Sequence, residues 1–381
     1  MHKIQEIFKL SYNEYRNHFN PSDVQHKAAL SIMDCKSGRL GCNLSVCDDC
    51  GHLVAHNNSC RNRNCPCCQS MTRELWIDAR KAEVIDSSYF HVVFTLPAEL
   101  NPLIYANQAS LYSLMHKSVS ETLLELSSDK KYLGATPGII QVLHTWGQKL
   151  NFHPHIHCII TGAGLTKTNQ LLKSRKKFFL PVRVLGKMFR GKFLAQLQSL
   201  YTEHKLHFPG QCPQLKNSYE WNGFITPLYD KPWIPYIKET FNGFGNAIDY
   251  LGRYTHRIAI SNSRIKSVTG THVTFTAKDY RTGEPGEVFL PQVEFLHRFL
   301  MHVLPSGFQK IRYYGFLNNR SKKKNLTLIV KLTGKALFQP KLRSMNHEEL
   351  LRALWNINVR FCPECGCCSM RHLGKTYPLL N

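Results

Sequence analysis

The stretch GIIQVLHTWGQKLNFHPHIHCIITG, residues 138–162, holds two runs of strand-forming residues around a short polar segment. The apolar and β-branched composition of 138–147 and of 153–162 favours two strands, and so short a connection predicts a hairpin. We place its turn at Leu150–Asn151. Because helical and strand patterns alternate on both sides of this hairpin, we expect an α+β fold with a largely antiparallel sheet.

Two histidines of the HPHIH motif share one face of the second strand. Side chains alternate along a strand, so His155 and His157 project on the same side. The expected register places His144 opposite His157 and Gln148 opposite His153. A divalent metal ion therefore has two ligands on a rigid strand and a third from His144 or, alternatively, from Gln148. The competing interpretation is an ordinary pair of surface histidines.

Outward from the hairpin, hydrophobic spacing predicts the remaining elements. The expected helices cover 1–34, 103–126, 243–257 and 293–304, another follows the basic stretch 173–193 and ends near His204, and strands cover 89–97, 233–241 and part of 321–330. No internal repeat and no long flexible linker interrupts this order. We therefore expect the units to pack against one another.

The charge balance points to a polyanionic partner. Lys and Arg number 49 against 26 Asp and Glu, a formal net charge of +23 in 381 residues. Nucleic acid is the first candidate because basic side chains release counterions when they bind phosphates, and an anionic membrane is the competing one. No apolar run approaches the length of a membrane span, and the start of the chain lacks the apolar core of a signal peptide. We expect a cytoplasmic protein without a membrane partner.

The 14 cysteines are clustered, which indicates metal ligation in a reducing compartment rather than a disulfide framework. Cys47 and Cys50 form one CxxC pair, and Cys65 and Cys68 form a second pair after a spacer of fourteen residues. Four thiolates from two such turns close a tetrahedron around Zn²⁺. The alternatives are buried free thiols and, less in keeping with a basic segment, a redox CxxC. We predict a structural zinc site.

Further candidates surround this predicted zinc site. Cys60 or Cys42 can replace one of the four ligands, or the surplus sulfurs can build a second zinc site. Arg61 and Arg63 lie beside these cysteines in the sequence, and they are candidates to contact a DNA phosphate. The tail CPECGCC offers one more pair, and the residues of this predicted second knuckle are Cys362 and Cys365.

Two tyrosines stand four residues apart in DYLGRYTHR, residues 249–257. On a helix Tyr250 and Tyr254 share a face, with Arg253 and Arg257 beside them. Alone, this pattern is equally that of a helix stripe buried in a core. Together with a metal site and a basic chain, the two hydroxyls are candidate nucleophiles for a phosphodiester.

The basic stretch 173–192 interleaves charge with phenylalanine, as a groove for single-stranded nucleic acid does. Lys176 and Lys177 are the predicted DNA contacts in it. An ordinary solvated loop with core phenylalanines is the competing interpretation. Zinc proteolysis is excluded by motif, because the HE pair at 347–348 is followed by Leu351 where a second histidine is required.

Taken in order, several blocks resemble those of the two-tyrosine HUH transposases, which move insertion sequences by a rolling-circle route. The resembling segments are HTWGQKLNFHPHIHCIITGAG (144–164), FLPVRVLGKMFRGKF (179–193), DYLGRYTHRIAISN (249–262), KDYRTG (278–283) and LPSGFQKIRYYGFLNNR (304–320). SCRNRNCPCCQ (59–69) resembles the zinc-binding domain that precedes the catalytic domain in that family.

The resemblance covers about Cys42 to Arg320. With it we expect three parts: a helical and zinc-binding, DNA-binding domain over 1–85, an HUH catalytic domain over 86–290, and a C-terminal accessory region with a second cysteine cluster over 291–381. The resemblance implies that His155 and His157 hold Mg²⁺ or Mn²⁺ while Tyr250 or Tyr254 forms a 5′-phosphotyrosine with single-stranded DNA. Assembly into a homo-oligomer stays open. The alternatives are a plasmid or phage replication initiator or relaxase with the same chemistry, and a non-catalytic zinc-finger DNA-binding protein.

Overall fold

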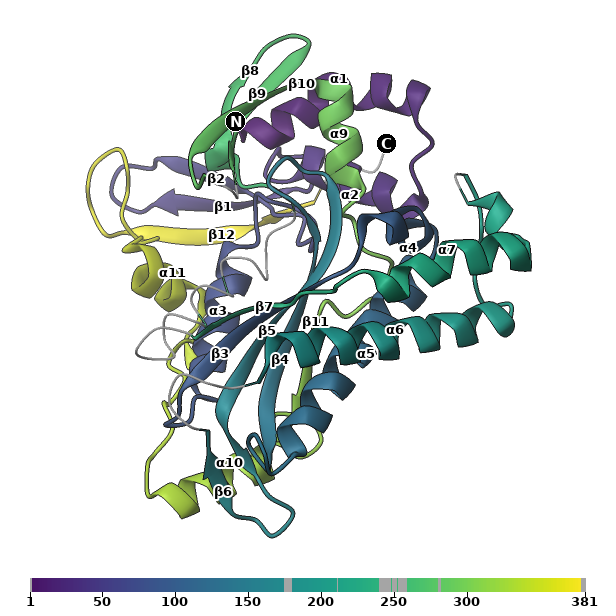
Figure 1. Ribbon diagram of the computed structural model, residues 1–381. Coiled ribbons are helices and arrows are strands. Elements are labelled where there is room, and N and C mark those ends of the chain that lie inside the picture. Colours follow the sequence, from purple (N-terminus) through teal and green to yellow (C-terminus); the bar gives the residue numbers. More distant parts are fainter. Residues whose placement is uncertain are drawn as a thin grey trace.

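An antiparallel sheet of six strands runs through the middle of the protein (Figure 1). The computed structural model describes residues 2–174, 180–210, 212–239, 248, 252, 259–279 and 282–377. The sheet order is β11 (Ile311–Gly315), β4 (Thr136–Trp146), β5 (Phe152–Leu165), β3 (Tyr89–Thr95) and β7 (Tyr236–Glu239), and β6 (Leu171–Lys173) pairs with the end of β5. The predicted α+β class with an antiparallel sheet is confirmed.

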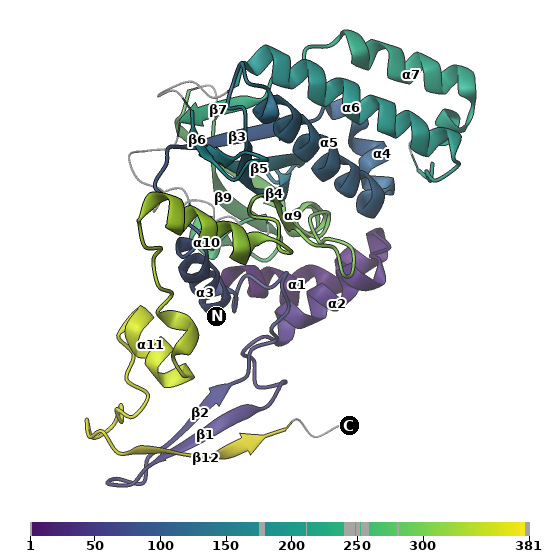
Figure 2. The ribbon, with the colours of Figure 1, turned by 90° about the horizontal axis from the view of Figure 1, so that it is seen from below.

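One face of this sheet is covered by a layer of helices (Figure 2). These are α4 (Asn101–Ala106), α5 (Gln108–Ser128), α6 (Val182–Thr202) and α7 (Ser218–Asp230). The expected helix over 103–126 is divided at Asn107, whose side-chain amide donates to the carbonyl oxygens of Leu103 and His207. Phe189 of the basic stretch is 1 % exposed and packs on Phe94, so this phenylalanine belongs to the core rather than to a groove.

The opposite face carries α3 (Ser70–Lys81) and α10 (Lys322–Thr333). The prediction of a strand within 321–330 is wrong, because this segment is the helix α10. Leu326 and Ile329, three residues apart, are buried together on one side of it, and the helix ends at Gly334 in the left-handed conformation. The lysines at its start occupy the first turn, where Lys322 pairs with Glu83.

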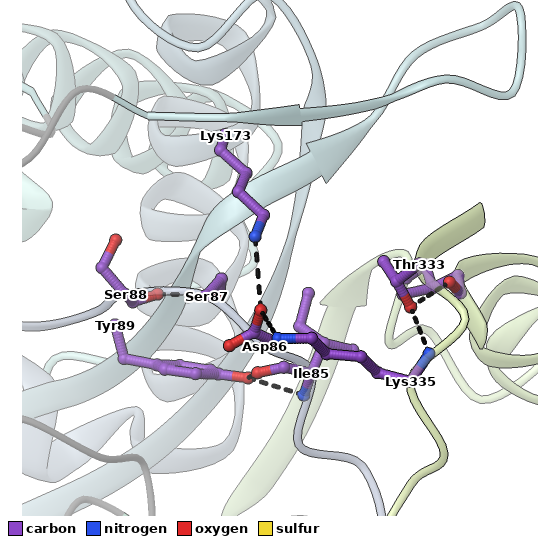
Figure 3. Close-up of polar contacts among 9 residues, drawn as sticks. Ile85, Asp86, Ser87, Ser88, Tyr89, Lys173, Thr333 and Lys335 are labelled. Atoms are coloured by element: carbon purple, nitrogen blue, oxygen red, sulfur yellow. Dashed lines mark hydrogen bonds and ion pairs between the residues drawn. The ribbon is translucent and has the colours of Figure 1, made fainter.

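The ends of these elements are tied by ion pairs and capping contacts (Figure 3). Asp86, just before β3, pairs with Lys173 of β6 at 3.4 Å and with Lys335, after α10, at 2.6 Å. The hydrogen bond from Lys335, and after it the positive charge of Lys173, lowers the pKa of the Asp86 carboxyl. The Tyr89 hydroxyl donates to the carbonyl oxygen of Ile85 and so fixes the entry into β3.

A second core joins the start of the chain to residues near its end. Helices α1 (Lys3–His18), α2 (Asp23–Asp34) and α9 (Gln292–Leu300) pack with the sheet β10 (Pro285–Pro291), β9 (His272–Lys278) and β8 (Ile265–Val268). The helix expected over 1–34 is interrupted at Pro21, and Ser22 then begins α2 with a capping box to Gln25. Phe8 and Phe299 meet edge to face at 5.3 Å between ring centroids.

A third sheet forms an arm that projects from the body (Figure 2). Its order is β12 (Met370–Thr376), β1 (Cys42–Cys47) and β2 (Leu53–Asn57), and α11 (His347–Trp355) precedes β12 in the chain. Residues 291–381 therefore supply a helix to the second core, a strand to the central sheet and a strand to the arm.

Short 3₁₀ turns cover Ala98–Leu100, Pro213–Lys216, Asn262–Arg264 and Leu342–Ser344.

None of the helices in the described part of the chain combines the length and the apolar character that a membrane span requires.

Candidate active site and cysteine clusters

The hairpin of β4 and β5 forms as predicted, but its register differs by two residues. His144 lies opposite His155, not His157, and Val142 lies opposite His157. The loop is longer than expected, because Gly147 and Asn151 close it and a bulge lies between Trp146 and His144. Since side chains alternate with a period of two, a shift of two residues leaves every histidine on its predicted face.

Three imidazoles converge on that face. One ring nitrogen from each of His144, His155 and His157 lies within 4.8 Å of the others. The ring centroids of His144 and His157 are 4.4 Å apart, and those of His155 and His157 are 5.0 Å apart. Gln148, the alternative third ligand, instead accepts a hydrogen bond at its Oε1 from the backbone N–H of Lys278.

Hydrogen bonds orient two of the three rings. His155 Nδ1 donates to the carbonyl oxygen of His153 at 2.7 Å, so its Nε2 keeps the lone pair. His157 Nδ1 lies 2.8 Å from Nε2 of His91 in β3. Burial lowers the pKa of both His155 and His91 to about 4, and it lowers that of His157 well below its usual value. At neutral pH these imidazoles are uncharged, which is the form that binds metal ions.

His91 is not among the site residues expected from the sequence. Val93 pairs with His157 across β3 and β5, so His91, two residues away, is on the same face. The signal was a lone histidine in the apolar run YFHVVFT. This histidine is recognised as a neighbour of His157 only when the pairing of β3 with β5 is known.

Ile248 and Gly252, the two described residues nearest to Tyr250 in the sequence, lie in or beside an apolar cluster that includes residues of the histidine face. Ile248 is fully buried in an apolar cluster with residues of that face, and a Cβ placed on Gly252 would come within 2.3 Å of Ile77 Cγ1 in α3. The members of this cluster that come from the sheet include Ile140, Val142 and Ile159. Several predicted site residues lie outside the described residues, namely Tyr250, Tyr254, Arg253, Arg257, Lys176 and Lys177.

The predicted single zinc site of Cys47, Cys50, Cys65 and Cys68 is not assembled, because the structure divides these thiols between two clusters. The first cluster consists of Cys35, Cys60, Cys65 and Cys68, whose sulfurs lie within 4.8 Å of one another. Cys35 is a residue that the sequence alone does not single out. It ends α2, and the packing of that helix brings it to the others.

The other two thiols belong to the arm. Cys47 and Cys50 lie at the turn between β1 and β2, and they meet Cys362 and Cys365 of the tail. The six residues of β1 carry this turn roughly 20 Å along the arm, which keeps it from the first cluster. Cys42 joins neither cluster, and its sulfur lies 3.1 Å from the Thr376 hydroxyl.

The two arginines near the first cluster differ in their surroundings. Arg61 is exposed and available to a ligand in solution. Arg63 donates to the carbonyl oxygens of Phe308 at 2.5 Å and Pro305 at 2.7 Å, so its guanidinium holds the loop before β11. Lys310 in that loop is half-buried beside Trp146, and desolvation lowers its pKa to about 7.

Two family models match this chain. Residues 7–96, which contain the first cysteine cluster and the first CxxC of the arm, match a transposase zinc-binding domain. Residues 138–325, which contain the three histidines, match a putative transposase family. These matches, with the cysteine clusters, define the chain as a transposase with a zinc-binding domain.

Curated relatives match this chain along nearly its whole length. A protein from Sinorhizobium fredii (strain NBRC 101917 / NGR234) named putative transposase y4qJ is 39 % identical over 368 residues, 95 % of this chain and 92 % of that protein. The transposase for insertion sequence element IS801 from Pseudomonas savastanoi pv. phaseolicola is 29 % identical over 90 % of this chain and 82 % of its own length. This chain belongs to the IS91 family of insertion-sequence transposases. No solved structure is significantly similar to it.

Proposed function

We propose that this transposase cleaves single-stranded DNA and transfers the strand through a tyrosine ester, in rolling-circle movement of an insertion sequence. The observation that carries the proposal is the face of the central sheet. It places three imidazoles together, and residues of the same face share a buried apolar cluster with Ile248, two residues before Tyr250. A divalent ion held by the three imidazoles would polarise a phosphodiester for attack by a tyrosine that follows Ile248 in the sequence.

The donor set suits a divalent ion. The ligands at hand are uncharged imidazoles, and the pKa directions of His155 and His157 keep them so at neutral pH. Imidazole binds Mn²⁺ and later transition metals more strongly than Mg²⁺, which prefers oxygen. A bound ion would polarise the scissile phosphate and neutralise charge that develops there. Of the two proposed ions, Mn²⁺ therefore fits this cluster better than Mg²⁺.

The residues of the chain supply the remaining steps. The oxygen of Tyr250 or Tyr254 attacks phosphorus and loses its proton to solvent, while the bond from phosphorus to the 3′ oxygen breaks. The 3′ oxygen takes up a proton, and the 5′ phosphate stays esterified to tyrosine. A later 3′-hydroxyl reverses this step and completes strand transfer. Exposed Arg61 and the basic residues at 176, 177, 253 and 257 are the proposed contacts to DNA phosphates.

The ester is tested with the double substitution Tyr250→Phe/Tyr254→Phe. With a hairpin-containing single-stranded oligonucleotide and Mn²⁺, the wild-type protein is expected to form a covalent adduct visible on a denaturing gel. Without both hydroxyls there is no nucleophile, so adduct formation is expected to fall by at least about 10³-fold. The single substitutions then show which tyrosine initiates.

The matched control is Tyr219→Phe, since Tyr219 is an exposed tyrosine of α7. It is expected to leave the adduct unchanged. An adduct that persists in the double variant, or that never forms with the wild type, would leave the protein as a DNA-binding one without this chemistry.

His91 offers a separate test of the metal cluster. For His157 to bind a metal through Nε2, its Nδ1 must donate to His91, and this contact fixes the ring. We expect His91→Phe to weaken Mn²⁺ binding by about 10–100-fold, measured by titration calorimetry, without loss of the folded state. Unchanged affinity would show that the contact does not position His157.

A further inference from the structure

Two turns of the same kind face each other at the end of the arm. Cys47, Cys50 and Gly51 form the first, and Cys362, Cys365 and Gly366 form the second. In each turn the glycine N–H donates to the carbonyl oxygen of the first cysteine, and the N–H of that cysteine donates to the carbonyl oxygen five residues on. The glycines have φ of 72° and 76°, a left-handed conformation that favours glycine. These paired turns present four sulfurs to one point.

The spacing of the sulfurs is that of a metal tetrahedron. Cys47 Sγ lies 3.6 Å from Cys365 Sγ, and Cys50 Sγ lies 3.7 Å from Cys362 Sγ. Zinc–sulfur bonds of about 2.3 Å in a tetrahedron separate the sulfurs by about 3.8 Å, whereas a disulfide holds them about 2.05 Å apart. All four sulfurs lie within 4.8 Å of one another, so one ion can reach each of them.

Apolar packing does not account for the arm. In 42–57 and 361–377 the buried side chains are those of Cys47 and Cys362, and most of β2 and β12 is exposed. Strand pairing joins β12 to β1, with Cys47 opposite Met370, and Arg371 pairs with Asp48 at 3.1 Å. Such a small sheet without a core needs a further cross-link to be stable.

We propose that Cys47, Cys50, Cys362 and Cys365 bind a second zinc ion, and that this site fastens the tail of the chain to its N-terminal domain. The ligands come from positions 312 to 318 residues apart. The zinc-binding segment is therefore incomplete without the tail: residues 7–96 hold four ligands of one site and two ligands of the other. This inference is independent of the cleavage chemistry proposed above.

Zinc content tests the shared site. The full-length protein is expected to contain two zinc ions per chain by elemental mass spectrometry. Cys362→Ser/Cys365→Ser is expected to contain one, and so is Cys47→Ser/Cys50→Ser. Because both pairs hold the same ion, combining the four substitutions is also expected to leave one. The control Cys367→Ser/Cys368→Ser removes exposed thiols of the same tail outside the cluster and is expected to keep two.

Two results would overturn the proposal: two ions retained in the Cys362→Ser/Cys365→Ser protein, or a combined variant that loses more than either pair. Cobalt replacement in the unaltered protein covers the case of a variant that fails to fold. Two tetrahedral four-thiolate Co²⁺ centres per chain are expected from the intensity of the thiolate-to-cobalt absorption. A single such centre would contradict the second site.

Discussion

Replacing His155 and His157 with alanine is expected to reduce adduct formation with single-stranded DNA by at least about 10²-fold, even at saturating Mn²⁺. The two rings supply two of the three nitrogens in the cluster, and their neutral form is set by burial. Without them the proposed ion would lose two ligands and the phosphate its charge stabilisation, while both tyrosine hydroxyls remain in the chain. The measurement is the initial rate of covalent adduct formation.

The motif contains its own control. His153→Ala removes a third imidazole from the same strand but keeps the backbone carbonyl that orients His155. We expect it to retain at least about half of the wild-type rate, because a backbone hydrogen bond does not depend on the side chain. Equal losses in both variants would mean that the motif acts through strand stability rather than through metal binding.

The second large effect concerns the cluster of Cys35, Cys60, Cys65 and Cys68. The substitution Cys35→Ser/Cys65→Ser is expected to remove one zinc ion and to lower the melting temperature by roughly 10 °C. Both side chains are 1 % exposed and lie in the core formed by α1, α2 and α9. Structural zinc contributes folding free energy directly, about 10–16 kcal/mol in isolated zinc fingers, and residues 58–69 contain no helix or strand to compensate.

Cys42→Ser is the matched comparison, because Cys42 lies between Cys35 and Cys65 in the sequence and outside both clusters. The hydroxyl of the introduced serine can keep the contact to Thr376. Zinc content and melting temperature are therefore expected to equal the wild-type values within experimental error. If Cys35→Ser/Cys65→Ser keeps both ions, these four thiols are not zinc ligands.

The central hairpin shows how much of a site local pattern can predict. Alternation placed His155 and His157 on one face and His144 on the facing strand, and the structure brings the three together. The register itself was two residues off, because the loop is closed between Gly147 and Asn151 with Leu150 buried in the second core at φ 61°. A buried leucine in a turn depends on contacts far away in sequence.

The segment 321–330 shows where local pattern is ambiguous. Its short apolar run NLTLIV suits a strand as well as a buried helix, and periodicity cannot separate them over so few residues. Packing decides: α10 places Leu326 and Ile329 against the central sheet and Lys322 against Glu83. The same holds for His91, whose relation to His157 exists only through the pairing of β3 and β5.

The sequence by itself determined which residue types are available for metal binding: paired cysteines and paired histidines at spacings that suit metal ions, on a strongly basic chain. The tertiary structure decided which cysteines share a cluster. Each CxxC turn fixes the positions of two sulfurs locally, but the other two ligands of a tetrahedron come from other parts of the chain that pack beside the turn. Here α2 returns Cys35 to one pair, and the pairing of β12 with β1 returns Cys362 and Cys365 to the other. The spacing within a CxxC pair is a local property of the chain, whereas the cysteines that complete each cluster are brought in by tertiary packing, from about 30 residues away in the first cluster and from more than 300 in the second.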